Sequence, residues 1–209
     1  MFKSDDELYH NVSCYLHMIN TENFQKLEIS SPSDLRNWLK ENHQQEESIW
    51  IVTYKKNVPE KYVSRDEVLD EILCFGWIDG IRRKLDDYRT MQLLSPRRVQ
   101  HWAKSYKERA QKLILEGRMH ESGFQSIEDS KKSGLWNFMD DVDALIKPKD
   151  LVLELQKYPT AEPFFDSIAD SSKRWVLRWI KLAKTEKTRA SRIKKTAALA
   201  AKGEKVPQS

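Results

Sequence analysis

The first half of the chain carries patterns typical of β-strands separated by shorter helical patterns. Residues 48–54 read Ser-Ile-Trp-Ile-Val-Thr-Tyr, a run of β-branched and aromatic side chains that predicts a central strand. A weaker alternation of apolar and polar positions over 24–29 predicts another strand. Residues 77–85 and 89–94 flank an acidic turn at 86–88, and this arrangement predicts a β-hairpin. Together these patterns predict a small sheet, mixed or antiparallel.

Capping signals predict two helices between these strands. Ser31 is followed by Pro32, which suits the first turn of a helix. Ser64 is followed three residues later by Glu67, so the pair can form a capping box. Gly76 stands where the second helix can end in a left-handed conformation. The apolar face of this second helix is expected to share a core with the 48–54 strand and two tryptophans, Trp38 and Trp77.

From residue 102 onward the apolar positions follow a helical period. Trp102, Tyr106, Ala110 and Leu113 share one face of a helix that is predicted to end at Gly117. Further helices are predicted at 122–132, 148–157, 160–168, 172–183 and 187–201. The predicted fold class is therefore α+β, with a sheet and packed helices in the N-terminal part and an all-helical C-terminal module.

The same patterns predict three parts of the chain. Residues 1–22 form an N-terminal extension, residues 23–140 an α+β domain, and residues 141–209 a helical module with basic C-terminal helices. The extension has no clean period, but it allows a short amphipathic helix with its apolar side at Leu8, Val12, Tyr15 and Leu16.

Composition excludes several classes of protein. The cysteines, Cys14 and Cys74, are too few for a disulfide framework, and Cys74 is expected to be a buried, unreactive thiol. The longest apolar run, residues 72–78, is far too short to span a bilayer, and the acidic N-terminus does not resemble a signal peptide. The expected location is the cytoplasm. The histidines are scattered, so neither a metal site nor a cofactor is expected.

Charge is arranged in blocks along the chain. Residues 82–118 carry eleven basic and four acidic side chains, and residues 173–209 carry twelve basic and two acidic ones. The segments 1–81 and 119–172 are acidic. Oppositely charged blocks can pair within one molecule, and we favour this interpretation over a surface that binds polyanions.

The densest group of chemically capable residues surrounds Asp79, which stands between Gly76 and Gly80. Glycines on both sides let the chain turn sharply and hold the carboxylate in a fixed direction. One interpretation is a structural corner. The other is a pocket for an anionic ligand, because arginine pairs bind carboxylates and phosphates and indoles can form an apolar wall. The candidate ligand-binding residues are Trp77, Asp79, Arg82, Arg97, Arg98, Trp102 and Lys104.

Strand alternation gives a further expectation for this region. Arg82 and Lys84 share one face of the predicted strand and Arg83 the other, so one of these sets is expected to face the helices. An unpaired buried cation is very costly. We therefore expect Asp79 to be substantially buried and to accept a charge-assisted hydrogen bond.

Several motifs resemble a known family. Residues 75–80 (Phe-Gly-Trp-Ile-Asp-Gly), 95–98 (Ser-Pro-Arg-Arg), Trp102 and 116–119 (Glu-Gly-Arg-Met) look like the YdeI/OmpD-associated family, also described as bacteriocin-protection or OmdA proteins. Residues 178–193 are similar to the helical module of that family. The resemblance extends over nearly the whole chain and implies an α+β part followed by a helical module. It implies no reaction.

Three functions from different classes follow from these observations. The first is a cytoplasmic, non-enzymatic protein that binds a small anionic ligand or a protein partner and is linked to envelope stress or to bacteriocin and antimicrobial-peptide resistance. It rests on the family resemblance and on the absence of a nucleophile–base pair. The sequence also has no Gly-rich phosphate loop, no Cys-x-x-Cys pair and no Gly-x-Ser-x-Gly motif.

The second function is nucleic-acid or polyanion binding by the basic C-terminal helices. Its candidate residues are Lys173, Arg174, Arg178, Lys181, Lys184, Arg189 and Arg192. The aromatic residues of the first basic helix fall on its apolar side, whereas proteins that bind single strands expose aromatics for stacking. The third function is an enzyme that uses Asp79 or Glu71 as an acid or base.

Overall fold

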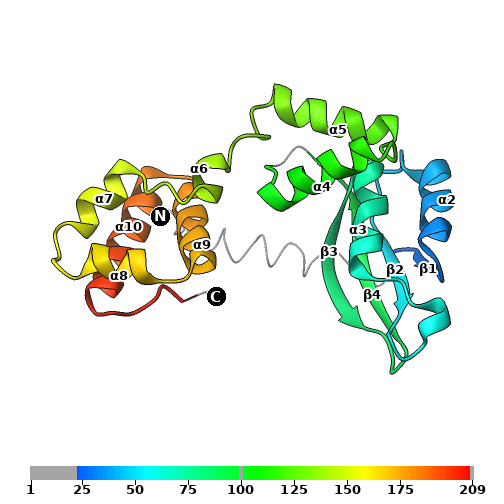
Figure 1. Cartoon of the computed structure of the whole chain (residues 1–209), viewed down its shortest axis with the longest axis horizontal. Coiled ribbons are helices and arrows are strands. Elements are labelled where there is room, and N and C mark those ends of the chain that lie inside the picture. The colour runs from blue at the N-terminus through cyan, green and yellow to red at the C-terminus, as the bar shows by residue number, and fades with distance from the viewer. Residues whose placement is uncertain (1–22, 99–100, 208–209) are drawn as a thin grey trace, which may run out of the picture. The chain divides into compact units, whose positions relative to one another are not determined.

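A computed structural model describes residues 23–98 and 101–207, which form two compact units (Figure 1). The N-terminal unit contains residues 23–98 and 109–128, and the C-terminal unit contains residues 101–108 and 129–207. Residues 129–140 thus belong to the C-terminal unit, although the sequence pattern groups them with the α+β domain. The predicted extension at 1–22 lies outside the described residues.

The N-terminal unit is built on a four-stranded mixed sheet, which confirms the predicted α+β class. Its strands are β1 (Lys26–Glu28), β2 (Ile49–Tyr54), β3 (Trp77–Lys84) and β4 (Arg89–Pro96), in the order β1-β2-β4-β3. β1 runs parallel to β2, whereas β2–β4 and β3–β4 are antiparallel. β2 is therefore an inner strand, as its composition predicts, and the β3–β4 hairpin forms as predicted.

Helices α2 (Pro32–Asn42) and α3 (Arg65–Cys74) each begin with a complete capping box. Ser31 and Ser64 are the N-caps, and both accept a hydrogen bond from the backbone N–H three residues later. A single 3-10 turn, η2 (Pro59–Lys61), precedes α3. Gly76 ends α3 with φ = 74°, the left-handed conformation expected of it.

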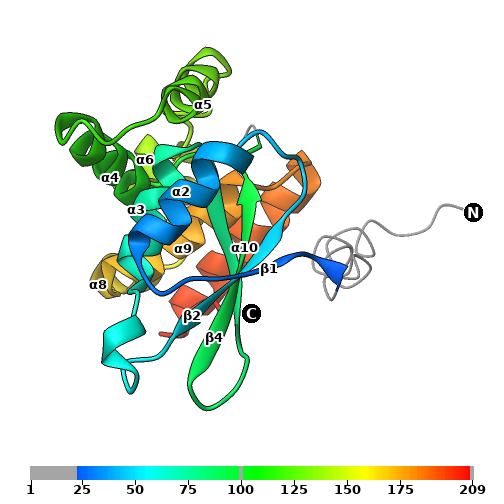
Figure 2. The same ribbon diagram turned by 90° about the vertical axis from the view of Figure 1, so that its right-hand side faces the viewer.

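Both α2 and α3 pack on the same face of the sheet (Figure 2). The indole of Trp77 on β3 meets that of Trp38 on α2 edge-on, with ring centroids 5.7 Å apart. Arg65, the first residue of α3, reaches Asp79 on β3. Beneath these helices the sheet presents side chains that are fully excluded from water, including Ile51 and Leu94.

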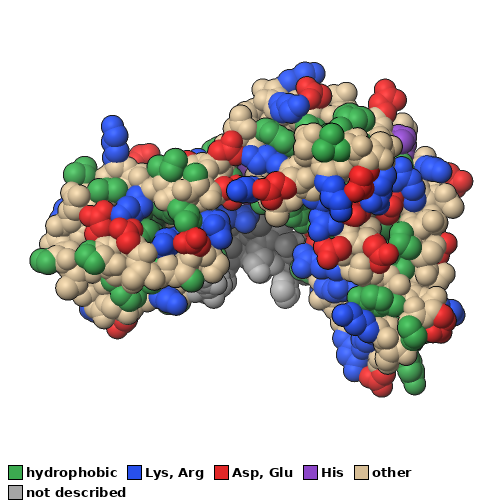
Figure 3. Space-filling model, viewed as in Figure 1, with side chains coloured by type: hydrophobic (Ala, Val, Ile, Leu, Met, Phe, Trp, Pro, Cys, Tyr) green, Lys and Arg blue, Asp and Glu red, His purple; other side chains and the backbone are tan. Residues whose placement is uncertain are grey.

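As expected, Arg82 and Lys84 lie on the sheet face that carries α2 and α3, because they pair with Gln92 and Thr90, whereas Arg83 lies on the other face, over the Trp50 ring. All three side chains are exposed, and cationic side chains gather along the β3–β4 hairpin (Figure 3). β3 is an edge strand, and its register shifts between Asp79 and Arg82, which places these two side chains on the same face of the sheet. Cations on an edge strand discourage pairing with other chains.

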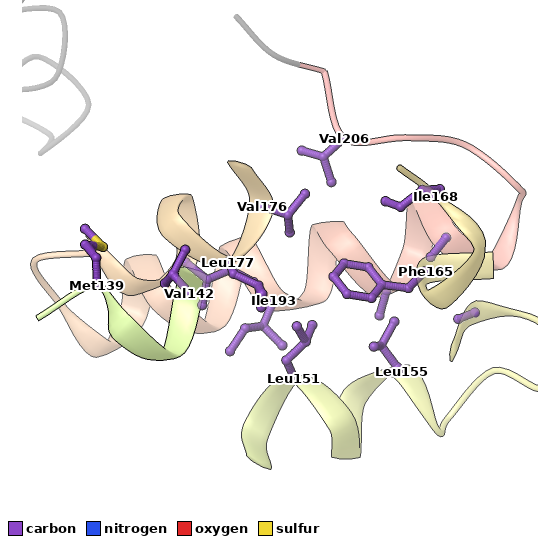
Figure 4. Packing of buried hydrophobic residues seen from close by; sticks show 14 residues of the cluster. Met139, Val142, Leu151, Leu155, Phe165, Ile168, Val176, Leu177, Ile193 and Val206 are labelled. Atoms are coloured by element: carbon purple, nitrogen blue, oxygen red, sulfur yellow. The ribbon is translucent and has the colours of Figure 1, made fainter. Parts of the chain in front are cut away.

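The remaining helices follow in the predicted order, with the addition of the short helix α6 (Asp140–Asp143), which the sequence pattern did not predict. They are α4 (Lys104–Leu115), α5 (Glu121–Lys132), α6 (Asp140–Asp143), α7 (Lys149–Leu155), α8 (Ala161–Ser167), α9 (Asp170–Lys181) and α10 (Glu186–Ala201). Helices α4 and α5 contribute residues to both units. The C-terminal unit has its own core, in which Leu151, Leu155, Phe165 and Ile193 meet between α7, α8 and α10 (Figure 4).

Leu73 on α3 is 1% exposed and is the most direct test of the N-terminal core. We expect Leu73→Ala to lower the free energy of unfolding by about 2–5 kcal/mol, because it leaves a cavity in a packed core. Urea denaturation measures this loss. Leu115→Ala, at a side chain that is 80% exposed, is the control and should change stability little. Equal effects of the two changes would contradict the observed packing of α3.

Candidate functional site

The Asp79 carboxylate is buried and takes part in a charge-assisted bond, as predicted. Its side chain is 6% exposed, and Oδ2 accepts hydrogen bonds from Arg65 Nη2 at 3.0 Å and from Gln92 Nε2 at 3.1 Å. Arg65 was not among the candidate residues. Because these bonds join the start of α3 to β3 and β4, the geometry supports the structural corner rather than a ligand pocket.

The other arginines predicted for this site lie along β3 and beyond the end of β4. Arg82 is exposed and its Nη2 approaches Thr53 Oγ1 at 3.4 Å. The backbone N–H of Arg97 donates to Gly76 O at 2.9 Å, which holds the end of α3 against the end of β4. Arg98 is exposed. A binding role for these arginines stays a prediction.

The tryptophans among the candidates are interior residues. Trp77 is 0% exposed, and its Nε1 donates to the His43 carbonyl at 3.0 Å. Trp102 is 1% exposed, belongs to the C-terminal unit, and donates to Ser130 Oγ at 2.7 Å. Both indoles therefore use their single polar atom within the core. Lys104, also in the C-terminal unit, is exposed.

The strongest polar cluster surrounds Glu71, which sequence reasoning named only as a possible acid or base. Glu71 is 5% exposed on α3. Its two carboxylate oxygens bind Arg36 Nη1 and Arg118 Nη2, each at 2.8 Å. Arg36 also donates to the Arg118 carbonyl at 2.8 Å. These bonds join α2, α3 and the segment after α4. Only the Glu-Gly-Arg-Met motif, which contains Arg118, signalled this cluster in the sequence.

A third arginine extends the cluster along α3. Arg109 donates to Asp66 Oδ1 at 2.6 Å and to Asp70, and Asp70 also lies 3.5 Å from Arg118. Burial lowers the pKa of Arg118, but the hydrogen bonds that its guanidinium donates to Glu71 and Glu116 outweigh this effect, so the pKa is raised overall. Such arginines stay charged at any relevant pH. The cluster therefore acts as a permanent electrostatic tie between α3 and the segment 109–118.

Cys74 and His120 lie beside this cluster, and neither has the properties of a catalytic group. Burial, together with the charge of Glu71, raises the pKa of the Cys74 thiol, so the thiolate is disfavoured as expected. The His120 ring stacks on Phe75, with centroids 4.6 Å apart, and its Nδ1 accepts from the Ser122 N–H at 3.2 Å. Burial and the nearby His43 ring lower the pKa of His120.

The C-terminal unit contains a hollow of about 140 Å³ between α6, α9 and α10. Its apolar wall is formed by Val142, Ile146, Pro148, Leu177 and Ile180. Its rim holds two ion pairs, Lys181 with Asp141 and Arg189 with Asp150, the second with distances of 2.7 and 2.9 Å. Burial raises the pKa of Asp141, but the Lys181 ammonium outweighs this effect and lowers it overall. The hollow is therefore apolar inside and electrically balanced at its edge.

A wider, polar hollow of about 290 Å³ lies elsewhere in the same unit. It is bordered by Lys104, Lys107, Asp140 and Asp143. Lys107 forms an ion pair with Asp140, and the Lys104 N–H donates to Asp143 at 3.1 Å, so Asp143 satisfies the start of α4. Asp140 and Asp143 of the acidic helix α6 therefore have structural roles.

Several of the residues predicted to bind polyanions already interact with other side chains of the C-terminal unit. Lys173 pairs with Asp170 at 3.2 Å, and Lys181 and Arg189 form the ion pairs of the apolar hollow. Arg178 lies 3.1 Å from His101, and Arg192 lies over the Trp179 ring at 5.0 Å. Two more of these residues, Arg174 and Lys184, are exposed. Pairing within the unit agrees with the interpretation of the charge blocks that the sequence favours.

Residues 23–98 and 101–207 contain neither a metal-binding cluster nor a membrane-spanning helix. Within these ranges no three His, Cys, Asp or Glu side chains are grouped so that they could hold a metal ion. No helix in these ranges combines the length and the apolar character needed to cross a bilayer.

The fold is that of an α+β unit joined to a helical unit, and comparison with known families agrees with this division. Residues 144–203 match the family model described as "Bacteriocin-protection, YdeI or OmpD-Associated", OmdA, which confirms the resemblance seen in the sequence. Residues 27–126 match a domain of unknown function, DUF8412. Searches of curated proteins and of solved structures found no match. The segment that contains helices α7 to α10 is thus similar to the OmdA family.

The structural role of Asp79 predicts the effect of removing its charge. We expect Asp79→Asn to lower the free energy of unfolding by about 1 kcal/mol, since Arg65 is 62% exposed and water can replace part of the bond. Asp87→Asn removes an 83% exposed carboxylate that pairs with Lys84, and should change stability little. Chemical denaturation of both variants measures the difference, and a neutral Asp79→Asn would contradict the structural role.

The lowered pKa of His120 predicts a loss of stability in acid. Its pKa lies below 6.5 in the folded state, so between these two values the unfolded chain binds more protons. The contribution of His120 is therefore complete above about pH 6.5 and declines as the pH falls toward its folded pKa. Urea unfolding at pH 7.5 and 5.5 should show a smaller acid-induced loss for His120→Gln than for the unchanged protein. Equal acid-induced losses of stability in the two proteins would show that protonation of His120 does not cause the loss.

Proposed function

We propose that this protein is a non-enzymatic binding protein of the bacterial cytoplasm that protects cells against bacteriocins or other antimicrobial peptides. The proposal takes its biological setting from the description of the OmdA family, which the C-terminal unit matches. It takes its molecular form from the apolar hollow in that unit.

The apolar hollow is the observation that carries the proposal. Six of its lining residues fall within the OmdA match at 144–203, namely Ile146, Pro148, Leu177, Ile180, Lys181 and Arg189. A volume of about 140 Å³ is well below the roughly 300–1,000 Å³ of pockets that enclose drug-sized ligands. The hollow therefore suits one inserted apolar side chain of a protein partner.

The charge of the rim distinguishes between the two kinds of partner expected from the sequence. A small anionic ligand needs cations that are available to it, but Lys181 and Arg189 are each held by an aspartate. A protein partner gains from excluding water over the apolar wall and needs no net charge there. The geometry thus supports a protein partner more than a small anion.

Nucleic-acid or polyanion binding receives less support. Three of its seven candidate cations form ion pairs within the unit, and each would have to exchange an aspartate for a phosphate. The indoles of Trp175 and Trp179 stack on each other with centroids 5.6 Å apart, and both are partly buried against the core. They offer less surface for stacking on bases than exposed aromatics would.

An enzyme with a carboxylate acid or base also receives less support. Both oxygens of Glu71 are bound to arginines, and Asp79 is bound to Arg65 and Gln92. A general acid or base must reach the proton that it transfers. In this structure both carboxylates serve instead as ties between α3 and its neighbours.

The test of the proposal uses Ile146, which lines the hollow yet is 60% exposed. Ile146→Asp places a charge at the apolar wall without opening the core, so the fold should persist. Bacterial cells that express the unchanged protein should survive a purified bacteriocin better than cells with an empty vector. Cells that express Ile146→Asp should lose most of this advantage.

Leu153→Asp is the matched control, because Leu153 is an equally exposed aliphatic residue, at 64%, of the same unit outside the hollow. This variant should protect like the unchanged protein. Immunoblots confirm equal amounts of each chain. Absence of protection by the unchanged protein contradicts the proposed function, whereas equal protection by Ile146→Asp rejects the hollow as the binding site.

A further inference from the structure

Among the described residues, β3 has a neighbouring strand on one side only (Figure 1). In the strand order β1-β2-β4-β3, its hydrogen-bonded partner is β4. Residues 80–84 of β3 are all exposed. Gly80 has no side chain, so its exposure shows that the backbone itself is accessible. We call residues 81–84 the free edge of the sheet, and this edge is open to a partner.

The hydrogen-bond pattern shows which backbone groups of the free edge point away from β4. The Leu85 N–H donates to Arg89 O at 3.2 Å, so these two residues form a hydrogen-bonded pair at the end of the hairpin. Hydrogen-bonded and non-hydrogen-bonded pairs alternate along antiparallel strands. Arg83 therefore directs its N–H and C=O groups toward β4, whereas Arg82 and Lys84 direct theirs outward. One more strand can form hydrogen bonds with these outward groups.

The free edge also carries a row of cations (Figure 3). Arg82, Arg83 and Lys84 are consecutive and exposed. Within the described part of the chain, the two guanidiniums contact a hydroxyl and an indole and form no ion pair with a carboxylate. Lys84 pairs with Asp87 at 2.7 Å, but both side chains are largely exposed, and such a pair contributes little to stability. Three positive charges are therefore available to a partner.

We propose that the free edge binds an extended acidic segment of a partner protein, which adds to the sheet as a further strand. Residues of this strand opposite Arg82 and Lys84 share their face of the sheet, and the residue between them shares the face of Arg83. Opposite Cβ atoms in a sheet are about 4.5–5.5 Å apart, a separation that lets a guanidinium bond to a carboxylate. Three consecutive Asp or Glu residues thus match the three consecutive cations.

Charge favours an acidic segment over a second copy of this chain. Two copies of β3 joined edge to edge would place the cations of one copy beside those of the other, and like charges directly opposite destabilise a sheet. An acidic run has the opposite charge, and the repulsion among its own carboxylates already extends it. It therefore loses less conformational freedom than a neutral segment when it becomes a strand.

A nucleic acid is the other polyanion that could meet these cations. Its phosphates accept hydrogen bonds but donate none, so they would leave the outward carbonyls of Arg82 and Lys84 unused. Proteins that bind single strands also present aromatic side chains for stacking. The indoles of this sheet, Trp50 and Trp77, are only 1% and 0% exposed. A peptide backbone, in contrast, both donates and accepts along its whole length.

Fluorescence anisotropy at physiological ionic strength measures binding of a short labelled peptide in which three consecutive glutamates are flanked by threonine and valine. We expect the unchanged protein to bind it. Arg82→Ser with Arg83→Ser should weaken the affinity about ten-fold, because two ion pairs are lost. Both side chains are exposed, so the fold should persist. The control, Lys40→Ser with Lys112→Ser, removes two exposed cations of the same unit outside β3 and should leave the affinity unchanged.

A second peptide separates strand addition from attraction between charges alone. It has the same sequence, but methyl groups on the backbone nitrogens of its glutamates remove the N–H donors and keep every charge. The proposal predicts that this peptide binds more weakly by about ten-fold or more. Equal affinities for the two peptides would overturn the proposal, as would failure of the unchanged protein to bind the first peptide. Tighter binding of an oligothymidine, lost in the arginine variant, would also overturn it and would identify a nucleic-acid site.

Discussion

The carboxylate of Glu71 is the interaction on which the N-terminal unit depends. It lies almost entirely inside the protein, and it is stable there because Arg36 and Arg118 each donate to one of its oxygens. Removing either arginine would leave the negative charge of Glu71 without full compensation at a buried position that water reaches poorly. The three residues come from α2, α3 and the segment after α4, so one ionic cluster determines how these parts meet.

This cluster also explains why the conspicuous chemical groups of the N-terminal unit have structural roles. Cys74 is one turn from Glu71 on α3, and its thiol is held neutral by burial and by that negative charge. Asp79 performs a similar task at the other end of α3, where Arg65 joins the helix to the sheet. The C-terminal unit differs, because its apolar hollow leaves space that its own side chains do not fill. Binding is therefore proposed for the C-terminal unit.

Local signals in the sequence predicted the elements well, because their causes lie within a few residues. The capping boxes at Ser31 and Ser64, the turn at Gly76 and the β3–β4 hairpin all depend on neighbours along the chain. The OmdA resemblance was likewise recognisable, since it rests on short motifs.

The candidate site was harder to predict, because its contacts join distant positions. Glu71 binds Arg36, which is 35 residues away in the sequence, and Arg118, which is 47 residues away. The pattern of apolar and polar positions does not predict contacts over such sequence separations. The exposure of Arg82 and Arg83 was not predicted, because the position of β3 at the edge depends on the order of all four strands. The hollow combines residues of α6, α9 and α10, and only packing brings them together.

A double-mutant cycle tests most directly whether the arginine–carboxylate cluster is structural while binding resides in the C-terminal unit. The cycle compares the unchanged protein with Glu71→Gln, Arg118→Gln and the double variant. Urea unfolding measures the stability of each protein. Survival of cells that express each protein, at temperatures at which that variant is folded, measures protection. The account predicts a coupling of about 0.5–3 kcal/mol in the free energy of unfolding, with protection retained by every variant that is folded. Additive effects on stability, or a stable variant that no longer protects, would contradict it.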